Sequence, residues 1–224
     1  MYVSAYYTIV KLLSWIILRV GFSLEVRGRE HLPRSGPYIL ASNHVSFLDP
    51  VVVGVACSRR VTFLARSTLF EQPLLGWFMR GCGVIPLLRG ETDFTALRAA
   101  ARRLRAGAVI GLFPEGTRQL SGTLGAARRG VGVLAVAADV PIVPMLVQGT
   151  YQAMPPSGGL HRAKIRVAFG PQITYTKARF SPRGSETIEP ERGHRSSRHE
   201  DLAEAVTHSW HQLQEALKEP TSHS

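Results

Sequence analysis

Short apolar runs separated by segments of helical pattern recur along most of this 224-residue chain. Runs of about four to eight apolar residues bounded by polar or turn-forming residues are typical of buried strands. Their alternation with helices is typical of an α/β domain. We therefore predict an α/β fold with a mixed central β-sheet flanked by helices. The predicted strands cover residues 24–26, 38–41, 61–65, 84–87, 108–113, 142–147 and 165–169.

The pattern also locates three helices after residue 90. One is predicted from Thr92, as N-cap, to Gly107, because glycine suits the left-handed turn that ends a helix. Another covers about residues 130–138. Ser197 and Glu200 form a capping box, which predicts the start of a C-terminal amphipathic helix.

A chain of this length can bury one core, and it shows no internal repeat. We therefore expect one α/β domain over residues 24–177. Residues 178–198 are rich in Arg, Ser, Pro, Gly and Glu and lack spaced apolar residues, so we predict a mobile loop there. Residues 199–224 are assigned to the last helix and the tail of the same domain.

Residues 1–23 form an apolar segment close to the roughly 20 residues that a membrane-spanning helix needs, yet Lys11 lies at its centre. At helical spacing its polar residues gather in one stripe. We therefore predict a helix that lies in the membrane interface with its lysine snorkelling towards water. A core helix of a soluble domain and a single membrane span remain alternatives. A signal peptide is disfavoured, because no basic region precedes the apolar run and no small-residue cleavage site follows it. The stripe comprises Ser4, Thr8, Lys11, Trp15 and Arg19.

The balance of 27 basic to 16 acidic residues gives a net charge of +11, which favours polyanions, anionic membranes or phosphorylated substrates as partners. Nucleic acid is disfavoured, because no zinc-finger spacing or aromatic RNA-binding signature is present and the basic residues are scattered. Arg128 and Arg129 are interpreted as a solvated or membrane-facing pair. Cys57 and Cys82 are too few for a disulfide framework. No cluster has metal-ligand spacing, so no metal is predicted.

The segment Phe113–Arg118, Phe-Pro-Glu-Gly-Thr-Arg, directly follows an apolar run. A Pro-Glu-Gly turn at the end of a strand offers free backbone N–H groups to an anion, and the planar guanidinium of Arg118 matches a phosphate. The segment therefore predicts a phosphate site. Glu115 has a structural alternative, in which it orients neighbouring amides or pairs with Arg118.

A second candidate segment places His44 five residues before Asp49, again directly after an apolar run. Imidazole can take a proton near neutral pH, and a carboxylate on its other nitrogen fixes the tautomer. We therefore predict His44 as a general base oriented by Asp49. Asp49 has a structural alternative as a helix N-cap, since Pro50 suits the first helical position, and the two roles are compatible. Ser46 lacks the Gly-x-Ser-x-Gly setting of a serine nucleophile.

Together with Gly83–Arg89 and Val140–Pro144, these segments form four ordered blocks that resemble the 1-acylglycerol-3-phosphate acyltransferase family over residues 43–144. The resemblance implies a glycerolphosphate acyltransferase-like fold. It also implies transfer of a fatty acyl chain from acyl-CoA or acyl-carrier protein to the free hydroxyl of lysophosphatidic acid, giving phosphatidic acid. It implies no cofactor beyond the acyl donor. The implied roles are catalysis for His44 and Asp49, substrate binding for Arg89, Glu115, Gly116, Thr117 and Arg118, and an acyl-donor wall formed by Pro141 and Pro144.

Two alternatives remain open at this stage. The same machinery can acylate glycerol-3-phosphate or another lysophospholipid. From a different class, the chain can be a non-catalytic peripheral protein that binds anionic lipids, although the presence of both His44 and Asp49 favours an enzyme. On either reading we expect a peripheral or monotopic protein on the cytoplasmic face of a membrane, with lipids as partners.

Overall fold

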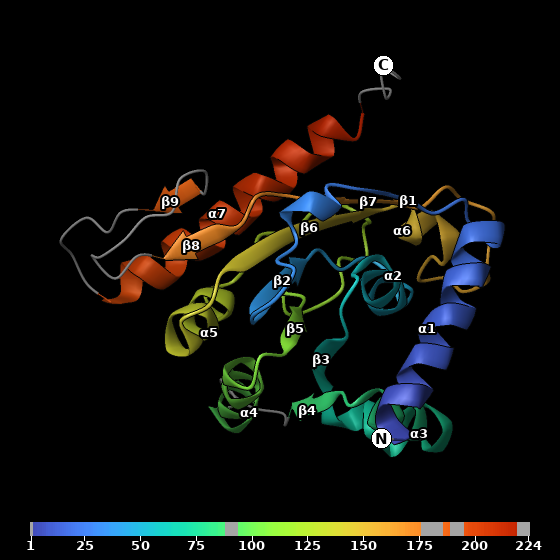
Figure 1. Ribbon diagram of the computed structural model, residues 1–224. Coiled ribbons are helices and arrows are strands. Elements are labelled where there is room, and N and C mark those ends of the chain that lie inside the picture. Colours follow the sequence, from blue (N-terminus) through green and yellow to red (C-terminus); the bar gives the residue numbers. More distant parts are fainter. Residues whose placement is uncertain (1, 88–93, 176–185, 189–194, 219–224) are drawn as a thin grey trace.

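The computed structural model describes residues 2–87, 94–175, 186–188 and 195–218 (Figure 1). Its strands form one mixed sheet in the order β1-β7-β6-β2-β5-β3-β4, with β8 paired to β6 and β9 paired to β8. The five strands from β6 to β4 run parallel, whereas β7 and β8 lie antiparallel to β6. The predicted fold class is confirmed. The strands are β1 (Glu25–Arg27), β2 (Tyr38–Ser42), β3 (Val61–Arg66), β4 (Ile85–Leu87), β5 (Val109–Leu112), β6 (Ile142–Gln148), β7 (Arg166–Phe169), β8 (Ile173–Tyr175) and β9 (Glu186–Ile188).

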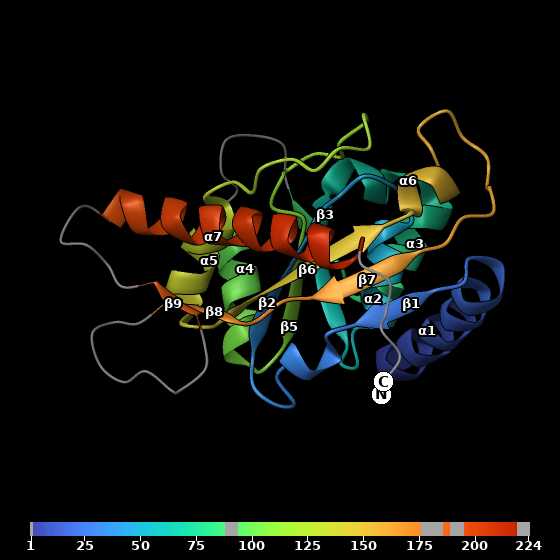
Figure 2. The same cartoon turned by 90° about the horizontal axis from the view of Figure 1, so that it is seen from above.

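Helices cover both faces of the sheet (Figures 1 and 2). On one face, α4, α5 and α7 pack over alternate side chains of the strands, such as Ile39 and Ile142. On the other face, α1 and α2 pack over the intervening side chains, such as Tyr38 and Val143. Strands buried on both faces have continuous apolar sequences, which is why the predicted strands match to within one residue. The helices are α1 (Tyr2–Gly21), α2 (Asp49–Ala56), α3 (Pro73–Cys82), α4 (Phe94–Arg105), α5 (Gly130–Ala138), α6 (Thr150–Ala153) and α7 (Arg195–Ala216), with short 3-10 helices η1 (Arg29–His31) and η2 (Ser67–Glu71).

Two predictions about the C-terminal part differ from the structure. The loop predicted over residues 178–198 contains β9, which pairs in parallel with β8. The last helix begins at Arg195, so Ser197 lies inside it and the predicted capping box is wrong. Gly107 follows α4 with a positive φ of 84°, as predicted, whereas Thr92 lies outside the described residues.

The first helix turns Lys11 towards the domain, which corrects the predicted snorkelling of this lysine, whereas Thr8, Trp15 and Arg19 of the predicted stripe are exposed. The Lys11 ammonium donates hydrogen bonds to the carbonyls of Cys57 and Ser58 at the C-terminal end of α2. A cation is stabilised there by the helix dipole, while burial lowers the pKa of Lys11 from its ordinary value. Among the described helices, none has both the length and the apolar character required to cross a bilayer.

Candidate active site

The candidate site lies at the carboxyl ends of β2 and β5, where the two motif segments leave the sheet. Directly after β2, the side chain of Asn43 pairs with the backbone of Val147 in β6. Its amide nitrogen donates to the Val147 carbonyl at 3.0 Å, and its oxygen accepts from the Val147 N–H at 2.8 Å. This side chain thus reproduces a strand pairing and fixes the start of the next loop.

His44 and Asp49 meet as predicted, with 2.8 Å between Nδ1 of His44 and Oδ2 of Asp49. The same carboxylate oxygen accepts the backbone N–H groups of Val45 and Ser46, each at 2.7 Å. Asp49 is fully buried. It is the first residue of α2, and the N-cap position belongs to Leu48, which makes no side-chain capping bond. The carboxylate therefore organises the His44 loop and does not act as an N-cap.

The ring of His44 is held in one orientation. With Asp49 accepting from Nδ1–H, Nε2 is the nitrogen left to accept a proton. The ring stacks on Phe113 with centroids 4.1 Å apart, and the side chain is 17% exposed. Ser46 is engaged elsewhere, because its hydroxyl donates to the Met154 carbonyl and accepts from the Leu48 N–H. This geometry supplies an oriented base without a serine nucleophile beside it.

Glu115 joins the two motif segments instead of facing solvent. It is 1% exposed, with one oxygen accepting from the His44 N–H and the other from the Gly125 N–H, both at 3.1 Å. Burial, with a further contribution from the nearby charge of Asp49, raises the pKa of Glu115 to about 7, although those two amides oppose the shift. The contacts are those of a positioning residue, the structural alternative to substrate binding, and the amides that Glu115 orients belong to His44 and Gly125.

The turn after Glu115 lies beside the guanidinium group of Arg128 and leads into Arg118. Gly116 has a φ of 79°, which glycine adopts without strain. A Cβ atom added there would lie 3.5 Å from the guanidinium of Arg128, so this side chain lies against the turn. Arg118, two residues further on, places its guanidinium carbon 3.6 Å from the centre of the Phe47 ring. The predicted phosphate site therefore has a second, exposed arginine, Arg128, beside its turn.

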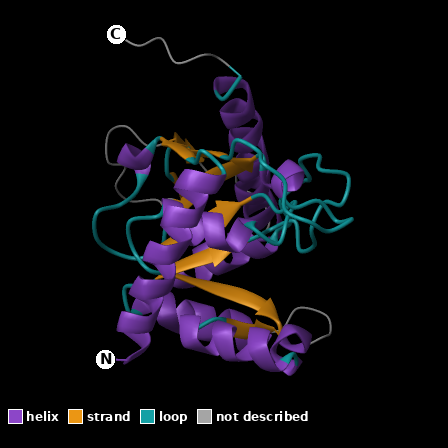
Figure 3. Cartoon of the chain, turned by 90° about the vertical axis from the view of Figure 1, so that its right-hand side faces the viewer, coloured by secondary structure: helices purple, strands orange, loops and turns teal. Residues whose placement is uncertain are grey.

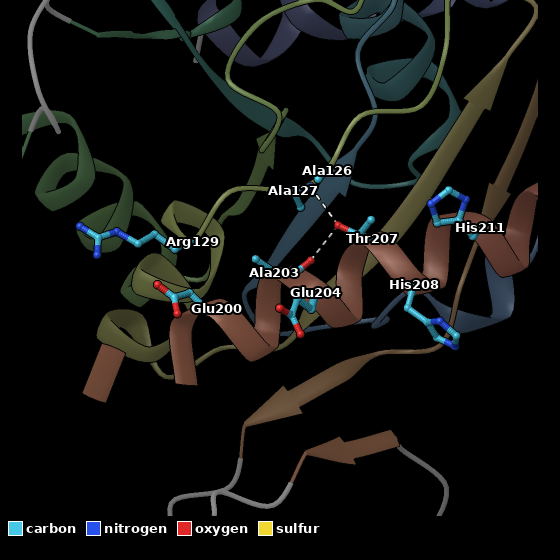
Figure 4. Close-up of a pocket in the computed structure, with 9 residues that line it drawn as sticks. All are labelled: Ala126, Ala127, Arg129, Glu200, Ala203, Glu204, Thr207, His208 and His211. Carbon is cyan, nitrogen blue, oxygen red and sulfur yellow. Dashed lines mark hydrogen bonds between the residues drawn. The ribbon is translucent and has the colours of Figure 1, made fainter. Parts of the chain in front are cut away.

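The position of Arg128 is set by the segment that returns from the turn. Its own N–H donates to the Pro114 carbonyl at 2.9 Å. The preceding N–H, of Ala127, donates to the hydroxyl of Thr207 in α7 at 2.9 Å, the upper dashed line in Figure 4. Two residues before Ala127, the N–H of Gly125 donates to the Glu115 carboxylate. Figure 4 also shows the pocket of about 470 Å³ between this segment and α7, which contains none of the predicted site residues.

Three of the remaining predicted site residues were Arg89, Pro141 and Pro144. Arg89 lies outside the described residues. The carbonyl of Pro141 accepts from the Ile39 N–H, and the carbonyl of Pro144 accepts from the Gly170 N–H. Pro144 is buried within β6, and Pro141 directly precedes this strand. The two residues of the predicted acyl-donor wall thus lie in the sheet and at the entry to its strand.

Sequence reasoning missed the roles of Asn43, Phe47, Phe113 and Arg128. Asn43, Phe47 and Phe113 stand inside the quoted motif segments, which is the signal that marked them. Their partners lie far along the chain, 104 residues away for Asn43, and spacing alone does not reveal such pairs. For Arg128 the sequence offered only two adjacent arginines before a glycine.

Comparison with known proteins identifies the family of the chain. The model of the acyltransferase family matches residues 23–148, more than half of the chain. The chain is 33% identical over 175 residues to the chloroplastic 1-acyl-sn-glycerol-3-phosphate acyltransferase BAT2 of Brassica napus, covering 76% of this chain and 51% of the plant protein. It is 35% identical over 150 residues to the human 1-acyl-sn-glycerol-3-phosphate acyltransferase alpha, covering 64% of this chain and 53% of the human protein. The chain thus spans about half the length of these two relatives.

The fold is also that of a solved structure. The crystal structure of the 1-acyl-sn-glycerophosphate acyltransferase PlsC from Thermotoga maritima superposes with a TM-score of 0.68 at 20% identity. The superposition covers 92% of this chain and 79% of the PlsC chain. Family match, fold and motif segments coincide on the same strands, and the chain therefore belongs to the acyltransferase family.

Proposed function

We propose that the protein transfers a fatty acyl chain from an acyl thioester, acyl-CoA or acyl-carrier protein, to the free hydroxyl of 1-acylglycerol-3-phosphate, giving phosphatidic acid. The observation that carries this proposal is the oriented His44–Asp49 pair. It is tied through Glu115 to a turn that lies against Arg128 and leads into Arg118. Relatives about one-third identical to the chain bear the name of this activity.

In the proposed reaction, Nε2 of His44 takes the proton of the acceptor hydroxyl as that oxygen attacks the thioester carbonyl. The carbon–oxygen bond forms and the carbon–sulfur bond breaks. The thiol leaves with the proton that the imidazolium returns. Asp49 stabilises the imidazolium through the 2.8 Å bond to Nδ1. No covalent acyl-enzyme is required.

The acceptor phosphate would lie against the turn at Gly116, between Arg118 and Arg128. Arginine suits this role because its planar group donates two parallel hydrogen bonds to a phosphate. The stacking of Arg118 on Phe47 holds the cation in place. Thr117 and Gly116 would contribute backbone N–H groups, and Arg89 remains a further predicted ligand.

An acceptor with a long acyl chain resides in a lipid bilayer, so the proposed reaction takes place at a membrane. We place the protein there as a peripheral or monotopic protein on the cytoplasmic face. The apolar side of α1, which faces away from the domain, supports this placement.

An acceptor panel tests the proposal. Purified full-length protein would be mixed with radiolabelled acyl-CoA, or with acyl-carrier protein as donor, and with lysophosphatidic acid, glycerol-3-phosphate or a zwitterionic lysophospholipid. We expect labelled phosphatidic acid by thin-layer chromatography, and on the order of a hundredfold less with His44→Ala. A product only with another acceptor would replace the proposed substrate. Lipid binding without transfer from either donor would identify a non-catalytic lipid-binding protein.

A further inference from the structure

Helix α1 is oriented with its apolar side outward. Tyr7 accepts a hydrogen bond from the Val61 N–H, and Lys11 contacts the end of α2, so these polar groups face the domain. The large apolar side chains on the other side are exposed. Exposure of a contiguous apolar face of this size marks an interaction surface. The exposed side chains are Ile9, Leu12, Leu13, Trp15, Ile16, Ile17 and Val20.

A second helix extends this face. Leu74 and Trp77 of α3 are 81% and 63% exposed. Trp77 meets Tyr6 of α1 edge to face, with ring centroids 5.5 Å apart. Gly81 lets the helices approach, because a Cβ atom there would come within 2.6 Å of the Tyr6 ring. Figures 1 and 3 show the start of α1 beside α3.

The structure points to a lipid bilayer as the occupant of this joint face. Neither α1 nor α3 contains Asp or Glu, and their charged residues are Lys11, Arg19 and Arg80. An apolar face on two helices whose own charges are all cationic complements the apolar layer and the anionic head groups of a membrane. Tryptophan at its edge suits the layer where apolar chains meet head groups.

We propose that the exposed side chains of α1 and α3 form a single membrane-docking surface, with Trp77 inserted in the interfacial layer beside α1. The proposal rests on the membrane location given above and adds α3 to it. The surface is in fixed register with the active site. Lys11 binds the last carbonyls of α2, and Asp49 is the first residue of that helix. The eight residues of α2 separate the two ends by about 12 Å. Docking through two helices fixes the orientation of the active site relative to the bilayer. Docking through α1 alone would leave the whole protein free to rotate about the axis of α1.

Tryptophan quenching by lipids with brominated acyl chains tests the proposal without any substrate. The chain has three tryptophans, and Trp210 is an internal control because it is fully buried and bonded to the Ala41 carbonyl. The full-length protein would be bound to phosphatidylcholine–phosphatidylglycerol vesicles with and without bromine. Three variants would be compared: Trp15→Phe, Trp77→Phe and the double variant.

We expect brominated lipid to reduce the fluorescence of Trp15→Phe through Trp77, and of Trp77→Phe through Trp15, but not that of the double variant. Quenching that disappears in Trp15→Phe would show that α1 inserts alone, and would overturn the proposal. Absence of quenching in every protein, with a dimer by light scattering, would assign the face to a second copy. Both outcomes are independent of acyl transfer.

A vesicle-flotation series adds a quantitative test. Leu74→Ser should weaken binding to the same vesicles by about tenfold, since one large apolar side chain no longer leaves water. Leu160→Ser is the matched control, because Leu160 is similarly exposed but lies outside α1 and α3. Leu74 is exposed, so its replacement leaves the fold intact. Equal binding by both variants and the unmodified protein would exclude α3 from the surface.

Discussion

His44 has one ring nitrogen committed to Asp49 and one available for chemistry. Removing the imidazole in His44→Ala should lower turnover by on the order of a hundredfold or more, the usual weight of a general base. Steady-state transfer from radiolabelled acyl-CoA measures it. The melting temperature should change little, since the side chain is not part of either apolar cluster. Near-normal turnover in a folded variant would refute the role of His44 as the general base.

The Asp49 carboxylate has a structural and an electrostatic role that two variants separate. In Asp49→Asn, the amide oxygen still accepts from His44, Val45 and Ser46, but the charge that stabilises the imidazolium is lost. We therefore expect a large loss of turnover with a small change in melting temperature. Asp49→Ala leaves buried N–H groups without an acceptor and should lower both. If Asp49→Asn keeps its turnover, Asp49 is only structural.

Arg118 and Arg128, near the Gly116 turn, should affect the KM for the phosphate-bearing acceptor more than the KM for the acyl donor. Arg128→Ala and Arg118→Ala should each raise the KM for lysophosphatidic acid about tenfold or more, and lysine at either position should restore it only partly. The KM for acyl-CoA should change less. Arg129→Ala is the control, because this neighbouring arginine lines the pocket beside α7. An equal effect of Arg128→Ala and Arg129→Ala would mean that only surface charge matters.

At the scale of elements, Glu115 links the loop after β2, the turn after β5 and the segment that returns to α5. Its raised pKa has a defined consequence for stability. Between the ordinary glutamate pKa and about 7, the folded protein holds a proton that the unfolded chain has released. The stabilising contribution of this group is therefore complete below that range and falls as the pH rises through about 7.

Glu115→Gln tests this linkage because glutamine does not titrate. The melting temperature of the unmodified protein, minus that of Glu115→Gln, should decrease as the pH is raised from 4.5 towards 7. The change corresponds to a free energy on the order of 1–3 kcal/mol. Thermal denaturation at matched ionic strength measures it. A difference that is constant with pH would show that Glu115 titrates normally.

The elements that could be predicted are those whose apolar residues show from the sequence alone that the element is buried. β2, β5 and β6 are apolar on both faces, and α5 agrees with its prediction at both ends. β8 and β9 were missed because each has only three residues with a threonine at its centre, so neither forms an apolar run. The His44–Asp49 pair was predictable because it is local. The links from Asn43 to β6 and from Arg128 to Gly116 depend on tertiary packing.

At the scale of the whole molecule, α1 is part of the catalytic domain as well as its outer surface. Near its N-terminal end, Tyr6 contacts α3 and Tyr7 binds the start of β3. Near its C-terminal end, Leu18 and the following Phe22 lie in the apolar cluster beneath α2. The spacing predicted the helix but assigned Lys11 to water. Only the folded domain shows that Lys11 binds the end of α2, whereas Thr8, Trp15 and Arg19 of the same stripe are exposed.

This attachment determines how α1 can meet a bilayer. A helix that crossed the membrane would have to release the contacts at one end and expose Leu18 or Tyr6. We therefore expect both ends of α1 to lie on the same, cytoplasmic side. With Cys57 and Cys82 replaced, single cysteines at positions 3 and 23 should both react with a membrane-impermeant maleimide in inverted vesicles. Neither should react in intact cells. Labelling of the two positions from opposite sides would demonstrate a span and would require α1 to detach from α2 and α3.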